Sequence, residues 1–256
     1  MAQLSAPNFG SETSLVALAA KRRLPRHQSM DIDTLQWIKS NRPRDFPSGP
    51  VEHPPIMVAR YAIAPSRWFT LACQADSLHG QRHGARVAIL AAHLARLGEL
   101  PVDQTLEAVI AAALHDCRRL HDQDDTGHGA RAARWFLQRH PNVIAHLPSA
   151  AKNVRRFVIA TAVELHDVPY EEFDEVQERK YQAAPSIVDI VKTADALDRY
   201  RLPKLKWWPN HDRLRLIPPR WLHRYAFDLV VKTEGHRLNG LSSERAIVDT
   251  LNEVKL

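Results

Sequence analysis

The sequence predicts an all-α fold. Apolar residues recur at the three- and four-residue spacing of an amphipathic helix in five segments between about residues 71 and 202. Alternating apolar and polar residues, which mark half-buried strands, are scarce, and no Asn-Gly or Asp-Gly turn joins two such runs. With 256 residues, the chain is long enough to bury one full hydrophobic core.

The first two predicted core helices lie on either side of Gly98. Val87, Leu90 and Leu94 share one face of the first helix, and Gly98 is the expected stop signal. The second helix is an almost wholly apolar run over residues 106–114 that leads directly into His115. We therefore expect His115 at the end of a buried helix.

Three further core helices are predicted. One follows His128 and is expected to end near Pro141, because proline removes a backbone donor from a helix interior. Another is marked by apolar residues over 154–165 and runs into His166. The fifth carries Asp195 between two alanines.

Two segments of different composition flank this core. Residues 1–70 are rich in proline, arginine and serine and are expected to form an irregular arm with a short helix over Ile32–Ser40. Residues 203–256 are expected to pack their tryptophans on the core and to close with a helix over Ser243–Val254. The predicted domain organisation is an N-terminal arm, a helical core over 71–202 and a C-terminal extension.

Composition sets only broad limits on function. The formal net charge of +6 suits a phosphate-bearing substrate and suits a nucleic acid equally well. Two cysteines, Cys73 and Cys117, are too few for a disulfide framework, and we expect Cys117 to be buried filler rather than a metal ligand. No apolar run approaches the roughly 18 residues that cross a bilayer, and no signal-peptide pattern opens the chain. The expectation is a cytoplasmic protein without a membrane partner.

Six ionisable side chains follow one another in the order His, His-Asp, His, His, Asp. Polar groups beside apolar helical stripes are costly to bury unless they are paired or bound to a metal. Imidazole and carboxylate suit one or two divalent ions of Mn, Fe, Zn, Co, Ni or Mg. The first ion would take His83, His115, Asp116 and Asp195, and a second would add His128 and His166, with Asp116 able to bridge.

Three more residues are candidates for contact with a substrate. His79 lies four residues before His83 and shares its helix face, which fits either a substrate contact or a structural cap. Arg119 has the fork of donors that binds phosphate, although a pair with a nearby aspartate is the alternative. Lys192 lies about one turn before Asp195 and is a candidate to face the pocket.

These motifs resemble the HD-domain superfamily of metal-dependent phosphohydrolases. The resemblance covers about residues 77–202 and implies a bundle of five or more core helices around a central metal site. It matches His83, His115, Asp116 and Asp195 to the family's ligands, and two-metal members use additional histidines where His128 and His166 fall. The motifs that carry it are His79-Gly80-Gln81-Arg82-His83 with Arg86-Val87, Ala112-Ala113-Leu114-His115-Asp116, His128-Gly129 and Lys192-Thr193-Ala194-Asp195-Ala196-Leu197-Asp198-Arg199.

The resemblance implies a phosphatase or phosphodiesterase that acts on a nucleotide or a related small phosphate ester. Hydroxide generated at the metal would be the nucleophile. Two alternatives stay open: a di-iron oxygenase on the same helical scaffold, and a non-catalytic module that binds nucleic acid, the less favoured partner, through the basic C-terminal segment. The residues predicted to assist catalysis are Asp116, Arg119, Lys192 and His79.

Overall fold

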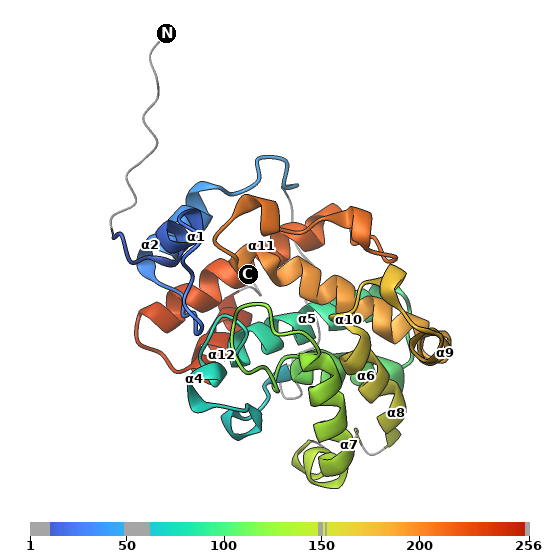
Figure 1. The fold of residues 1–256 in the computed structure, drawn as a ribbon. Coiled ribbons are helices and arrows are strands. Elements are labelled where there is room, and N and C mark those ends of the chain that lie inside the picture. Colours follow the sequence, from blue (N-terminus) through green and yellow to red (C-terminus); the bar gives the residue numbers. More distant parts are fainter. Residues whose placement is uncertain (1–10, 49–61, 148–150, 152, 254–256) are drawn as a thin grey trace.

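The computed structural model describes residues 11–48, 62–147, 151 and 153–253 (Figure 1). Within these ranges every regular element is a helix, which confirms the predicted all-α class. No helix in the described part of the chain is both long enough and apolar enough to cross a membrane.

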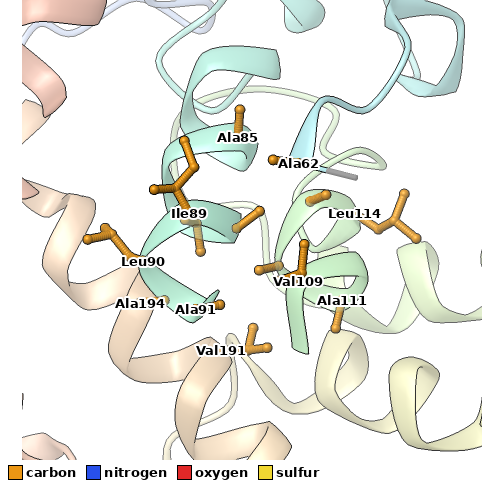
Figure 2. Close-up of a cluster of buried hydrophobic side chains, with 14 of the residues drawn as sticks. Ala62, Ala85, Ile89, Leu90, Ala91, Val109, Ala111, Leu114, Val191 and Ala194 are labelled. Atoms are coloured by element: carbon orange, nitrogen blue, oxygen red, sulfur yellow. The ribbon is translucent and has the colours of Figure 1, made fainter. Parts of the chain in front are cut away.

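Helix α5 (Gln81–Leu97) packs against both α6 (Val102–Leu114) and α10 (Pro185–Asp198), which also pack on each other (Figure 1). Gly98 ends α5, as predicted. Close packing of small and branched side chains fills the space between the three helices. Figure 2 shows this core, which includes Ala85, Ile89, Leu90, Ala91, Val109, Ala111, Leu114, Val191 and Ala194.

Two helices complete the side of the bundle that carries the later histidines. Helix α8 (Arg156–Leu165) packs on α6 and α10, and α7 (His128–His146) packs on α8. The predicted end of α7 near Pro141 is wrong, because the helix continues through the proline. The backbone bond that Pro141 cannot make would end at the carbonyl of Leu137, an exposed residue where water can take its place.

The N-terminal part of the chain adds to the core rather than lying apart from it. Helix α2 (Ile32–Ser40) has the predicted bounds, and the side chain of Asp31 caps its first turn. The short α1 (Leu15–Ala20) packs beside α2, and α2 packs against α11. The buried side chains of Leu15 and Ile38 belong to the same hydrophobic cluster as the bundle.

The C-terminal part holds a long helix that we did not predict, α11 (Arg220–Leu238). It contacts α2, α5, α10 and α12, so several of its faces are buried and its apolar residues do not form one stripe. The predicted closing helix is present as α12 (Ser243–Glu253), and Val254 lies outside the described residues. Trp208 packs edge-on against Trp37 at a centroid distance of 5.9 Å, which fits the prediction that the tryptophans cover the bundle.

Short helical segments connect the longer ones. Helix α9 (Glu175–Gln182) starts with a capping box between Asp174 and Gln177 and packs beside α8 and α10. The remaining segments are α4 (Ala72–Ala75), η2 (Ser66–Trp68), η4 (Tyr170–Glu172), η5 (Arg199–Arg201), η6 (Leu205–Trp207) and η7 (His211–Arg213).

Candidate metal centre

The fold brings all six predicted ligand residues together. They come from five helices, and four of them stand at or beside a helix end. His83 lies in the first turn of α5, His115 caps the end of α6 and is followed by Asp116, His128 begins α7, His166 caps the end of α8, and Asp195 lies in α10.

The first group of ligand atoms surrounds Nε2 of His83. This atom lies 3.0 Å from Nε2 of His115, 3.4 Å from Oδ2 of Asp116 and 3.3 Å from Oδ1 of Asp195. The two histidines are fully buried, whereas the Asp195 side chain is 28% exposed. Asp195 therefore marks the side of this group that is open to solvent.

The second group surrounds the other oxygen of Asp116. Oδ1 of Asp116 lies 2.8 Å from Nε2 of His128 and 3.5 Å from Nε2 of His166. The two Nε2 atoms are 3.0 Å apart. Asp116 thus offers one oxygen to each group, as a carboxylate does when it bridges two metal ions.

Hydrogen bonds at Nδ1 fix the orientation of all four rings. A carbonyl oxygen can only accept a hydrogen bond, so a ring that contacts one through Nδ1 carries a proton there and, when neutral, presents a lone pair at Nε2. The Nδ1 atoms of His115, His128 and His166 donate to the carbonyls of Ala112, Asp125 and Val163 at 2.6, 2.8 and 2.7 Å, and Nδ1 of His83 donates to the Asp198 carboxylate at 2.8 Å.

The inward-facing atoms fit a divalent cation. Lone pairs 3.0 Å apart repel one another, and a proton or a metal ion between them would relieve this repulsion more directly than the N–H groups of Arg119 and Arg201, which lie 3.1 Å from Nε2 of His128 and 3.4 Å from Nε2 of His83. Oδ1 of Asp116 is buried and accepts no hydrogen bond. Two buried groups, His83-His115-Asp116 and Asp116-His128-His166, each bring three ligand atoms within 4.8 Å of one another and could hold a metal ion.

The pKa values of His115, His83 and Asp116 reflect both burial and the closely spaced charges of the site. Burial lowers the pKa of His115 to about 3, which leaves this ring in its neutral, ligating form. Burial also acts to lower the pKa of His83, but the carboxylates of Asp116, Asp195 and Asp198 outweigh it and raise the pKa to about 9. Burial acts to raise the pKa of Asp116, yet Arg119 and the histidines hold it well below its ordinary value, so this carboxylate is ionised.

His79 lies beside the first group and forms a pair with Asp122. Its ring meets the His83 ring edge-on at a centroid distance of 5.7 Å, and its Nδ1 lies 2.9 Å from Oδ1 of Asp122. Asp122 in turn accepts hydrogen bonds from the side chain of Ser77 and the backbone N–H of Gln28. Asp122 thus pairs with a histidine that lies 43 residues earlier in the chain.

Arg119 lies near the second group, but most of its donors are engaged. Nε and Nη2 donate to the carbonyls of His121 and Gln123 at 3.2 and 2.8 Å, which ties the guanidinium to the loop between α6 and α7. Nη1 lies 3.1 Å from Nε2 of His128 and 3.5 Å from Oδ1 of Asp116. The ion pair with a nearby aspartate, considered from sequence, is replaced by this contact with the ligand Asp116.

Lys192 occupies a different place from the predicted phosphate contact. Its buried Nζ donates to the carbonyls of Leu165, His166 and Val168 at 2.8, 3.1 and 2.5 Å. Leu165 and His166 are the last residue and the C-cap of α8, where a helix lacks partners for its last acceptors and favours a cation, and Val168 follows two residues later. All three N–H donors are therefore spent on holding the backbone around His166.

A cleft of about 410 Å³ adjoins the second group, with Arg119 and His128 in its lining. Two of its acidic residues have cationic partners, because Asp125 pairs with Arg131 and Glu164 with Lys180. The cleft is nevertheless predominantly acidic. The carboxylates in its lining are Asp124, Asp125, Glu164, Asp167 and Glu172.

Cys117 follows Asp116 but does not belong to either group of ligand atoms. It is buried in the hydrophobic cluster, and burial raises the pKa of its thiol to about 12. A thiol with that pKa is protonated at neutral pH, which fits the predicted role as buried filler.

Comparisons of the chain with protein-family models, curated proteins and solved structures found no match. The family resemblance of residues 77–202 therefore stays a prediction from motifs.

Proposed function

We propose that this protein is a metal-dependent phosphohydrolase that binds two divalent ions and hydrolyses a small phosphate ester. The observation that carries the proposal is the convergence of four imidazole Nε2 atoms on a carboxylate, Asp116, that faces two ligand groups with different oxygens. The resemblance to HD-domain phosphohydrolases supplies the reaction class for such a centre.

Each of the two ligand groups would bind one of the two ions. Divalent ions bound side by side lower the pKa of water and neutralise charge on phosphoryl oxygens, which is the chemistry that the proposed reaction needs. Asp116 would contribute one oxygen to each ion. His83, His115 and Asp195 would complete one site, and His128 and His166 would complete the other.

The surrounding residues hold this centre in place. Bonds from Nδ1 to carbonyls or to Asp198 prevent the rings from turning and keep each Nε2 directed inward. Lys192 fixes the backbone of His166, and Arg119 fixes the loop that carries Asp116 toward His128. We therefore assign Lys192 and Arg119 to positioning of the ligands.

His79 is the residue best placed to move a proton. Its Nδ1–H donates to Asp122, and Nε2 of the neutral ring is then available as an acceptor. The side chain is 13% exposed, so water can reach it, and it lies beside the first ligand group rather than in the lining of the cleft. Burial outweighs the bond to Asp122 and lowers the pKa of His79 to about 4, so the ring is neutral at neutral pH. At Nε2, the neutral ring would take a proton from the attacking water and return it to the leaving oxygen, while Asp122 fixes the orientation of the ring.

The cleft restricts the substrate. A volume of about 410 Å³ accommodates a small molecule, and its lining holds Arg119 and five carboxylates, two of which are paired with Arg131 and Lys180. A substrate with many negative charges is disfavoured by this lining, since like charges repel most strongly where water is partly excluded. We propose a mononucleotide or another small phosphomonoester or phosphodiester as substrate.

Metal analysis and turnover of an Asp116→Ala variant test the proposal. The wild-type protein should contain two divalent ions per chain and hydrolyse at least one member of a panel of nucleotides, cyclic nucleotides and simple phosphodiesters. Asp116→Ala should lose both ions and all turnover, because Asp116 serves both groups. A Glu253→Gln variant, altered at an ion pair on α12, is the matched control and should behave as wild type.

Three results would contradict the proposal. The first is an Asp116→Ala protein with full metal content and full turnover. The second is bound iron with substrate-dependent oxygen consumption and no hydrolysis, which would favour the oxygenase alternative. The third is salt-dependent nucleic-acid binding without hydrolysis of any panel member, which would favour a binding module.

A further inference from the structure

A buried chain of charged side chains joins the C-terminal helix α11 to His83. It starts at Glu234, which is 1% exposed and lies outside the segment that carries the family motifs. Glu234 accepts hydrogen bonds from Nη1 of Arg86 at 2.6 Å and from Nε of Arg82 at 3.0 Å. Both arginines belong to α5, the helix of His83.

Arg86 connects Glu234 to Asp198 at the end of α10. Its Nε and Nη2 donate to Oδ1 and Oδ2 of Asp198 at 2.7 and 3.0 Å, the two-pronged geometry that makes arginine–carboxylate pairs strong. Asp198 Oδ2 accepts the Nδ1–H of His83 at 2.8 Å. Glu234, Arg86, Asp198 and His83 are each no more than 1% exposed, so water does not screen the contacts between them.

The charges in this chain depend on one another. Arg86 is a buried cation between two carboxylates, and it shares its charge between Glu234 and Asp198. Without the negative charge of Glu234, the guanidinium would attract Asp198 more strongly and weaken its hold on Nδ1 of His83. A histidine that loses its carboxylate partner becomes a weaker and less well oriented metal ligand.

The second ligand group is held by other contacts. Nδ1 of His128 and Nδ1 of His166 donate to the backbone carbonyls of Asp125 and Val163. The hydrogen bonds described above for Glu234 and Arg86 involve neither ring. A change at Glu234 should therefore act on one group of ligands and leave the other unaffected.

We propose that Glu234 is a positioning residue for the metal site of His83, His115 and Asp195, acting through Arg86 and Asp198. This inference rests on the proposed metal centre. It makes α11, a helix outside the predicted HD-like segment, part of the structure that sets metal affinity.

Calorimetric titration of the metal-free protein with Mn²⁺ tests the inference. The wild-type protein should show two binding events, and Glu234→Gln should weaken one of them by about tenfold or more without changing the other. The same substitution should lower Mn²⁺ affinity when combined with His166→Ala, which leaves the His83 site. It should have no effect when combined with His83→Ala, which leaves the other site.

Glu107→Gln is the matched control. Glu107 is also a fully buried carboxylate, and it lies on α6, eight residues before His115. It accepts a hydrogen bond from Nε of Arg155 at 2.8 Å. It should leave both Mn²⁺ affinities unchanged. If Glu234→Gln does not fold, as judged by circular dichroism, Glu234→Asp keeps the charge and should produce a smaller loss confined to the same site.

Equal loss at both sites, no loss at either site, or the same loss in Glu107→Gln would overturn the inference while leaving the metal centre intact. A wild-type protein that binds no divalent ion would instead overturn the proposed function on which the inference rests. The titration thus separates the two failures.

Discussion

Two of the candidate ligands are oriented by the helices that carry them. His115 and His166 each follow the last residue of an apolar helix, and each donates its Nδ1–H to a carbonyl three residues earlier. The last carbonyls of a helix have no partner within the helix, so they are available to a ring at this position. A histidine at the end of a buried helix therefore donates a hydrogen bond to an otherwise unpaired carbonyl of that helix. The same bond directs Nε2 of the ring away from the helix.

At the same scale, the His79–Asp122 pair predicts a specific effect on catalysis. We expect His79→Gln to lower kcat by about 10²- to 10⁴-fold, because the variant lacks a group that accepts a proton at Nε2. Metal content should stay at two ions per chain, since no ligand is removed. Steady-state kinetics and elemental analysis on the same preparation check this prediction, and loss of metal in parallel with activity would contradict it.

At the scale of elements, α7 and α8 meet closely at Gly129. A Cβ atom at this position would lie 2.6 Å from the carbonyl oxygen of Val163 and 2.6 Å from Oδ1 of Asp167. Both distances are too short for a methyl group, so a larger residue must push the helices apart. His128 and His166 stand on these two helices, and their separation depends on the same contact.

Gly129→Ala should therefore destabilise the protein by about 1–3 kcal/mol and weaken metal binding at the His128 site. Gly235→Ala is the matched control, because its Cβ would lie no closer than 3.9 Å to Leu35 in the middle of α11. That change should stabilise the protein by up to about 1 kcal/mol through helix propensity. Thermal unfolding of both variants checks the two predictions. Equal melting temperatures for Gly129→Ala and Gly235→Ala would contradict the tight contact between α7 and α8.

At the scale of the whole molecule, Asp76 joins elements that are distant in sequence. It binds Arg82 of α5, Arg237 of α11 at 3.0 Å and Ser243 of α12 at 2.9 Å. Burial acts to raise the pKa of Asp76, but the bonds from Arg237 and Arg82 outweigh it and lower the pKa from 3.8 to about 2. A carboxylate with a lowered pKa contributes stability above pH 3.8 and loses it as the pH falls toward 2.

Asp76→Asn should thus lower the free energy of unfolding at pH 7 by on the order of 1 kcal/mol, a modest value because the side chain is half-exposed. The difference from wild type should shrink as the pH falls from 3.8 toward 2, where the wild-type carboxylate becomes protonated. Urea unfolding measured across this range checks the sign. A difference that grows toward low pH would contradict the assignment.

The molecule has a positive formal net charge, whereas carboxylates outnumber basic side chains in the lining of the cleft. The formal net charge is +6, but the cleft beside the second ligand group is lined by five carboxylates and one arginine. We expect kcat/KM for a nucleoside monophosphate to exceed that for the triphosphate by about tenfold or more. Glu172→Lys should reduce the ratio of kcat/KM for the monophosphate to kcat/KM for the triphosphate. Glu12→Lys should leave this ratio unchanged, because Glu12 belongs to an exposed ion pair and does not line the cleft.

Sequence by itself determined the all-α class and the segments that became α2, α5, α6, α8, α10 and α12, because apolar periodicity is a local property. It also indicated six candidate ligands, since polar residues at the ends of apolar helices are conspicuous in one dimension. The sequence did not predict α11, because this helix is buried on several faces and its apolar residues show no single helical period. It also wrongly predicted the end of α7 at Pro141, where the carbonyl of the exposed Leu137 can lose its helical hydrogen bond to water.

Only the tertiary structure decided which partner each polar group takes. Lys192 uses its donors on the end of α8, Asp122 orients His79, and Glu234 reaches His83 through two intermediates. It also decided which carboxylates gather in the lining of the cleft. These contacts join residues that lie tens of positions apart, and the free energy of a buried charge depends on the neighbours that packing brings to it rather than on those beside it in the chain.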